Sequence, residues 1–171
     1  QNINMWDVSN VKNMALMFSK LDNFNQPLDQ WNVSKVKIMY GMFSNTPNFN
    51  QSISNWNTKN VRDTEAMFMN ASSFDQDLSG WNINKLRTTR GMFFGASDFS
   101  KTLKTWDLKK VRKKGYMFDG AKSLKKKDYP KNYKPNEYEY IGLYEGEGKD
   151  IHYYKKYKKE YINLKKLINN R

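Results

Sequence analysis

The sequence predicts an α/β solenoid: a stack of five 25-residue coils, each made of a strand, a turn and a short helix. In this prediction the strands form a parallel sheet, and a C-terminal strand/helix cap closes the stack. Three observations carry the prediction. Tryptophan recurs at a constant interval, the apolar pattern changes from strand-like to helix-like within each interval, and an amphipathic helical pattern over about 151–168 follows the last repeat.

The repeat is defined by apolar columns that keep a step of 25 residues. A unit of this size cannot bury its apolar face alone, so neighbouring units are expected to stack. We therefore expect the tryptophan and phenylalanine columns to form the structural core. These columns are Trp6, Trp31, Trp56, Trp81 and Trp106, and Phe18, Phe43, Phe68, Phe93 and Phe118.

Within one unit, two apolar patterns follow each other. Residues 31–33 alternate apolar and polar, which is typical of a short strand. Val36, Met39 and Met42 are then spaced by three residues, which predicts one or two helical turns facing the core. Residues 44–48 are rich in turn-forming residues and predict a loop.

Two regions are expected along the chain. Residues 1–124 form the repeat solenoid, and residues 125–171 form a basic, Tyr/Lys-rich C-terminal cap with a helix over about 151–168. Gln1 occupies the repeat position of Gln26. We therefore expect the N-terminus to be truncated in mid-repeat, with an export and anchoring region missing.

Composition argues against catalysis. The 171 residues include no cysteine and one histidine, which excludes a disulfide framework, a thiolate metal site, a cysteine nucleophile and a multi-histidine metal site. No glycine-rich phosphate loop, zinc motif or nucleophile elbow occurs. We expect no enzyme, no catalytic residues, no cofactor and no bound metal.

The positive charge is unevenly distributed. Residues 1–100 hold 9 basic and 8 acidic residues, whereas residues 101–171 hold the remaining 21 basic and 9 acidic ones, out of a net charge of +13. A near-neutral scaffold followed by a cationic block favours an anionic partner or surface, or a role in solubility.

The spacing Leu28-x-x-Trp31-x-Val33-x-x-Val36 resembles the strand segment of a leucine-rich repeat, so the coils are leucine-rich-repeat-like. The fuller unit, residues 49–61 followed by Met67-Phe68, is similar to the repeat of BspA-like and mycoplasma surface lipoproteins, a family of unknown function. The resemblance covers about residues 1–124. It implies an extracellular or cell-surface protein, anchored through the missing N-terminal region and used in adhesion or host interaction.

One column of the repeat is basic in every copy. It consists of Lys12, Lys37, Arg62, Arg87 and Arg112. Stacked like charges about 5 Å apart repel by about 1 kcal/mol per neighbour in water. Such a stripe is a candidate site for a linear polyanion, such as a sulfated glycan or a nucleic acid. The alternative is that each side chain extends into solvent or pairs with an acidic loop residue.

The residues that follow each tryptophan form a second candidate surface for a host or surface protein. They are Asp7, Asn32, Asn57, Asn82 and Asp107. Repeat proteins use extended faces of this kind to bind partners, and the alternative is a solvated face.

The basic C-terminal block has three open interpretations. It caps the stack, it binds single-stranded nucleic acid through its interleaved tyrosines and lysines, or its helix rests on an anionic membrane. For the whole chain we expect a non-catalytic, surface-exposed binding or adhesion module that recognises a host protein or a polyanionic glycan. The alternative is a structural spacer within a larger surface protein.

Overall fold

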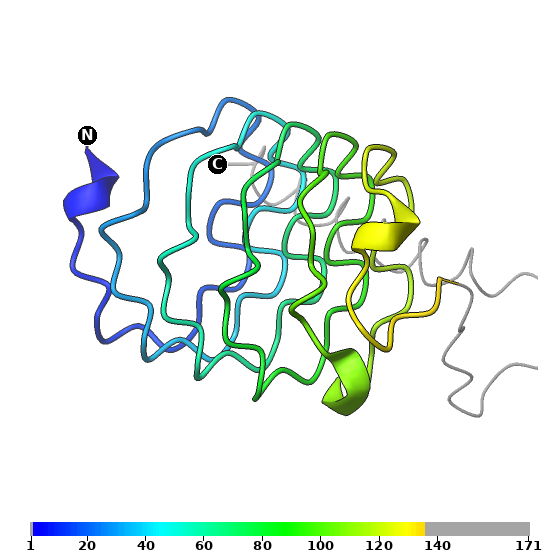
Figure 1. Ribbon diagram of the computed structural model, residues 1–171. Helices are drawn as coiled ribbons and strands as arrows, with labels where there is room; N and C mark the ends of the chain where they lie inside the picture. The colour runs from blue at the N-terminus through cyan, green and yellow to red at the C-terminus, as the bar shows by residue number, and fades with distance from the viewer. Residues whose placement is uncertain (1, 136–171) are drawn as a thin grey trace, which may run out of the picture. The chain divides into compact units, whose positions relative to one another are not determined.

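The computed structural model describes residues 2–135, which form a stack of coils lying side by side from the N-terminal end onward (Figure 1). Between residues 2 and 135 there are three short 3-10 helices, η1 (Ile3–Met5), η2 (Leu108–Lys110) and η3 (Lys126–Asp128), and neither an α-helix nor a β-strand. The chain divides into two units, Gln1–Glu139 and Tyr140–Arg171. The second unit, which contains the helix predicted over 151–168, lies outside the described residues.

Neighbouring coils are joined by a backbone ladder in strict 25-residue register. Single parallel bridges connect Asn13 to Ile38, Ile38 to Asp63, Asp63 to Thr88 and Thr88 to Lys113. Around each bridge, alternate residues of one coil donate their N–H groups to the next coil. The N–H of Phe43, for example, donates to the carbonyl of Met67 at 2.9 Å. The stack is therefore held by hydrogen bonds between coils, without continuous strands.

The predicted parallel-sheet α/β solenoid is wrong in its secondary structure. The strand expected at residues 31–33 is absent: these residues have no regular secondary structure and lie between turns at 29–30 and 34–35. Trp31 and Val33 are buried and Asn32 is exposed, so the alternation that suggested a strand is present. The backbone turns there because the side-chain Oδ1 of Asn32 accepts a hydrogen bond from the N–H of Ser34 at 3.2 Å.

The predicted short helix is also wrong. Met39 and Met42 are buried, but the N–H of Met42 donates to the carbonyl of Met39 at 3.2 Å and so closes a four-residue turn. Gly41, the third residue of this turn, has a φ of 54°, which is the arrangement of a type II turn. The three-residue spacing of the apolar side chains therefore comes from turns. The segment predicted to be a helix instead forms the backbone hydrogen bonds between coils.

Left-handed residues explain why the ladder does not become a strand. Two residues in each coil have positive φ, four positions apart. The first column is Leu16, Gly41, Ala66, Gly91 and Tyr116, and the second is Lys20, Asn45, Asn70, Gly95 and Gly120. Glycine and asparagine tolerate this conformation best, and they fill six of these ten positions.

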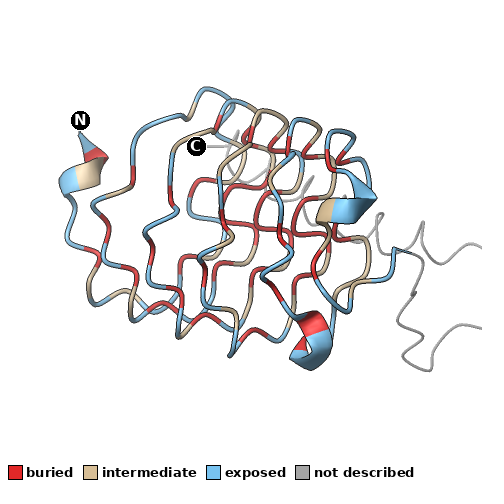
Figure 2. Ribbon diagram, in the orientation of Figure 1, coloured by how far each residue is buried: buried red, intermediate tan, exposed pale blue. Residues whose placement is uncertain are grey.

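Buried residues recur at matching places on successive coils (Figure 2), and the core that they form is made largely of stacked rings. Phe43 and Phe68 lie 5.6 Å apart and nearly parallel, and Phe43 also stacks on Phe49 of its own coil at 4.0 Å. Trp31, Trp56, Trp81 and Trp106 are buried, as are Phe18, Phe43, Phe68, Phe93 and Phe118. Trp6 is 43% exposed, because the first coil has a neighbour on only one side in the described structure.

The chain continues past residue 124 into part of a further coil, where the bridge joins residues 24 positions apart and lies at another repeat position than the ladder. Asp107 forms a parallel bridge with Lys131, and the N–H of Lys131 donates to the carbonyl of Trp106 at 2.8 Å. Tyr129 and Tyr133 each pack on Phe118 with ring centroids 5.0 Å apart. Burial, followed by the charge of Asp119, raises the pKa of Tyr133 to about 12. These two tyrosines cover the end of the phenylalanine column.

Candidate functional site: a basic column along the coils

The basic residues predicted to share one repeat position form a continuous column. The N–H of Lys37 donates to the carbonyl of Lys12, and the same bond repeats from Arg62 to Lys37, from Arg87 to Arg62 and from Arg112 to Arg87, all at 2.8–2.9 Å. All five residues are exposed. Because their backbones are bonded directly to one another, the ladder sets the backbone spacing of the five residues at about 4.8 Å. We call these five residues the basic column.

No ion pair neutralises the basic column within the part of the chain that the structure describes. Ion pairs join other residues there, such as Lys101 with Asp75 at 2.8 Å and Lys104 with Asp128 at 3.7 Å. The guanidinium of Arg87 has one long contact, 3.5 Å from Nη1 to the carbonyl oxygen of Leu86. The charges of the column therefore face solvent.

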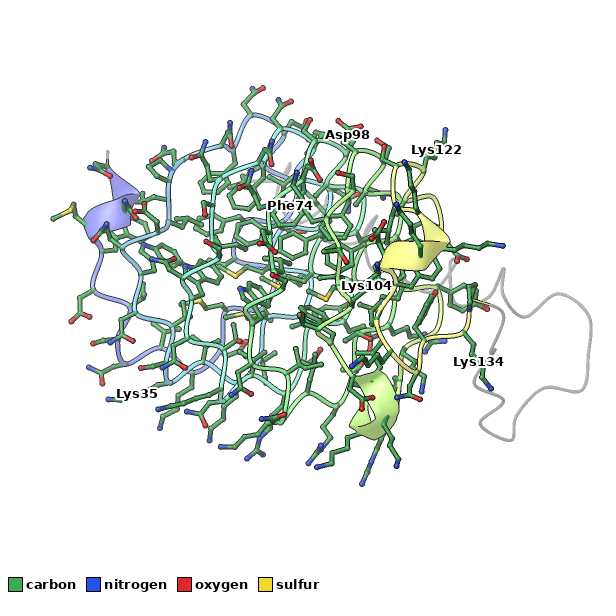
Figure 3. The ribbon with its side chains drawn as sticks, in the orientation of Figure 1. Lys35, Phe74, Asp98, Lys104, Lys122 and Lys134 are labelled. Carbon is green, nitrogen blue, oxygen red and sulfur yellow. The ribbon has the colours of Figure 1, made fainter. Side chains whose placement is uncertain are left out.

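Lysines beside the column are partly held by asparagines. The ammonium of Lys35 donates to Oδ1 of Asn10, and that of Lys85 donates to Oδ1 of Asn60, both at 2.8 Å. Figure 3 shows Lys35 at an edge of the coils where many nitrogen-tipped side chains point outward, whereas Lys122 lies at the opposite edge. The asparagine contacts orient these lysines and leave their charge in place.

The third coil carries acidic residues close to its member of the basic column in the sequence. Asp63 and Glu65 follow Arg62 on the same segment, and both are partly buried. Burial raises the pKa of Asp63, the neighbouring charge of Glu65 raises it further, and a hydrogen bond from the backbone of Glu65 and the charge of Lys113 oppose the change. Arg62 is thus the member of the column with acidic neighbours.

The fifth coil carries the largest concentration of basic residues. Lys109, Lys110, Arg112 and Lys113 are exposed, and Lys114 is partly buried. A surface hollow beside them is lined by Ile83, Asn84, Asp107, Lys109, Lys110 and Val111. Of these residues, only Arg112 belongs to the candidate polyanion residues predicted from the repeat. The lysines could have been predicted as part of the site from the run of basic residues over 109–114.

The candidate partner face has a local structural role. Each side chain of this face accepts a hydrogen bond from the backbone N–H two residues later: Asp7 from Ser9, Asn32 from Ser34, Asn57 from Lys59, Asn82 from Asn84, and Asp107 from Lys109. Hydrogen bonds from the side chain and then the backbone of Ser9 lower the pKa of Asp7, and the backbone hydrogen bond from Lys109 lowers the pKa of Asp107. The five residues of the candidate partner face are exposed, but one oxygen of each side chain closes a turn.

Residues 2–135 contain no group of three or more His, Cys, Asp or Glu side chains placed to hold a metal ion. No helix in that range is long and apolar enough to cross a membrane.

A family model describes the repeat seen in the structure. The model of a Mycoplasma protein of unknown function, DUF285, matches residues 1–65 and again residues 27–132. No curated protein and no solved structure matches the chain. The matched residues contain the five coils and their basic column, so the Mycoplasma part of the expected resemblance is confirmed. The chain belongs to the Mycoplasma protein family of unknown function, DUF285.

Proposed function

We propose that this chain is a non-catalytic binding module that holds a linear polyanion, a sulfated glycan in particular, along its basic column. The observation that carries the proposal is the backbone bonding from Lys12 through Arg112, which holds five exposed charges in one line. Like charges so close together raise the free energy of the unbound protein, and a polyanion laid along the column offsets that repulsion.

The chemistry of the column fits a polymer better than a single small anion. One basic side chain per coil supplies one contact at each step along the stack, so affinity would come from several weak contacts acting together. The three arginines of the column can each bind a sulfate through two parallel N–H donors. The resemblance to BspA-like surface lipoproteins belongs to the same proposal, because a surface location would expose the column to glycans outside the cell.

The test compares two variants of the full chain with equal charge. The column variant replaces Lys12, Lys37, Arg62, Arg87 and Arg112 by Gln. The control variant replaces five exposed lysines outside the column, Lys104, Lys122, Lys125, Lys126 and Lys127, by Gln. Both variants lose the same charge and keep residues 136–171 intact, so a difference between them reports on position rather than on net charge.

Binding to heparin is measured by titration at physiological salt. We expect the column variant to lose at least about tenfold in affinity, because each lost charge removes a contact and its counterion release, and the control variant to lose less than about threefold. Equal losses in both variants would overturn the proposal, since binding would then follow net charge. Thermal melting of both variants must match that of the parent chain, which checks that the fold is unchanged.

A further inference from the structure

We infer that the polyanion contacts concentrate on the fourth and fifth coils, where a short sulfated segment binds, and are not spread evenly along the column. This inference rests on the proposed function and narrows it to a ligand size and a position. Its basis is the net charge of the seven residues centred on each member of the basic column, which differs from coil to coil.

The charge of this segment rises toward the C-terminal end of the stack. Residues 9–15 carry one basic residue, residues 34–40 carry two, and residues 59–65 carry two basic and two acidic ones. Residues 84–90 carry three basic residues and residues 109–115 carry five, with no acidic residue in either segment. The last two coils therefore hold a net +8 (3 + 5) against +3 (1 + 2 + 0) for the first three.

The third coil separates the two parts of the column. Asp63 and Glu65 follow Arg62 in the chain and are partly buried, and Oε2 of Glu65 accepts a hydrogen bond from the hydroxyl of Thr88 at 3.1 Å. The ladder fixes the backbone at this point, because Arg62 donates its N–H to Lys37 and Arg87 donates its N–H to Arg62. The anionic groups of a polymer are repelled by these carboxylates, so contacts beyond the third coil contribute little.

The fourth and fifth coils also carry the polar groups that suit a sulfate ester. Arg87 and Arg112 are adjacent members of the column, joined by a 2.9 Å backbone hydrogen bond. Lys109 and Lys110 precede Arg112 in the chain and line a hollow together with Asp107. Two arginine forks with lysines around them can bind several closely spaced anionic groups within one short segment.

The same surface lacks the groups that hold single-stranded nucleic acid. Proteins that bind such strands combine positive charge with aromatic side chains on which bases stack. Residues 84–90 and 109–115 contain no aromatic residue. This absence favours a sulfated glycan, which needs charge and hydrogen bonds but no stacking surface.

Two matched triple variants of the full chain test the position. The fifth-coil variant replaces Lys109, Lys110 and Arg112 by Gln, and the first-coils variant replaces Lys12, Lys35 and Lys37 by Gln. All six residues are exposed, and each variant loses three positive charges. We expect the fifth-coil variant to lose at least about tenfold in heparin affinity and the first-coils variant less than about threefold.

Ligand length supplies a second readout. For heparin oligosaccharides of increasing size, the affinity per chain should level off once the oligosaccharide spans two coils. A steady rise up to the span of five coils, or equal losses in the two triple variants, would overturn this inference and leave the proposed function standing. If neither triple variant nor the five-site column variant lost heparin affinity, the proposed function itself would be overturned. Oligothymidylate of equal charge binding as tightly would overturn the choice of a glycan.

Discussion

The indole Nε1 of Trp56 donates a hydrogen bond to the carbonyl oxygen of Leu28, at 3.0 Å across two neighbouring coils. Trp31, Trp81 and Trp106 make the same bond to Ile3, Ile53 and Leu78 at 2.9–3.1 Å. Each tryptophan thus joins adjacent coils by stacking and by a buried hydrogen bond. This explains why the repeat uses tryptophan at a position where other large apolar residues would also fill the core.

Replacing Trp56 by Phe should lower the free energy of unfolding by about 2–3 kcal/mol, because it removes a buried donor and part of a buried ring. Trp6 provides the control, since it is 43% exposed and its indole makes no hydrogen bond within residues 2–135. Trp6→Phe should cost less than about 1 kcal/mol. Urea unfolding followed by circular dichroism measures both, and equal costs would contradict this role for the indole bond.

Thr89 is the one buried side chain in the described residues whose polar atom lacks a hydrogen-bond partner. The equivalent hydroxyl of Thr64 donates to the carbonyl of Thr88, at 3.3 Å. We predict that Thr89→Val raises the free energy of unfolding by about 1 kcal/mol, because an unsatisfied hydroxyl leaves the core. Thr64→Val should give no gain. A loss of stability on Thr89→Val, measured by thermal melting, would show that the hydroxyl has a partner after all.

Ala66 has a φ of 55° at a position where the second and fourth coils have glycine. We predict that Ala66→Gly raises the free energy of unfolding, by up to about 1 kcal/mol, because glycine adopts this conformation without steric cost. Ala71 is also buried but has no positive φ. Ala71→Gly should therefore lower stability by a similar amount. Chemical denaturation measures the change in the free energy of unfolding of each variant. A change of the same sign at both positions would contradict the role given to backbone conformation.

The pair of Asp75 and Lys101 predicts a dependence of stability on pH. Partial burial favours the protonated carboxyl, but hydrogen bonds from Lys101 and Ser100 and the charge of Lys101 outweigh it, so the pKa of Asp75 is lowered. A lowered folded-state pKa contributes stability above the unfolded value, and this contribution is lost as pH falls through the folded pKa. For a partly exposed pair we expect less than about 1 kcal/mol.

The earlier coils supply the matched control for this pair. In them, Asn50 accepts a hydrogen bond from the side chain of Gln76 at 2.7 Å, in the same repeat positions. The double variant Asp75→Asn with Lys101→Gln should therefore keep most of the stability at pH 7 and lose less than the parent between pH 5 and pH 2. Denaturant titrations across this range check the expectation. A parallel fall in parent and variant would show that the pair does not contribute.

The repeat period, the stacking columns and the line of basic residues could all be predicted from the sequence, because a constant interval sets which side chains lie above one another. The secondary structure could not. The alternation around Trp31 is typical of a strand, but the backbone N–H of Ser34 donates to the side-chain oxygen of Asn32 and the chain turns there. Likewise, the spacing of Met39 and Met42 fits a helix until the positive φ of Gly41 is known.

The candidate sites, too, could be predicted only in part from the sequence. The position of Lys12, Lys37 and the three arginines follows from the repeat alone. Whether acidic neighbours neutralise them depends on side-chain positions, which the sequence does not specify. The face around Asn32 closes turns through its own side chains. Every member of this face is Asn or Asp, the residue types that commonly bond the backbone N–H two positions later, so the sequence carries a signal for this structural role.

The salt dependence of heparin binding tests the basic column most directly. The logarithm of the association constant falls linearly with the logarithm of salt concentration, with a slope that grows by about 0.7–0.9 for each anionic group contacted. The parent chain and the five-site column variant are titrated between low and physiological salt. Our account predicts a slope shallower by about two or more in the variant. Equal slopes would contradict it, because the charges of the column would then make no contact with the ligand.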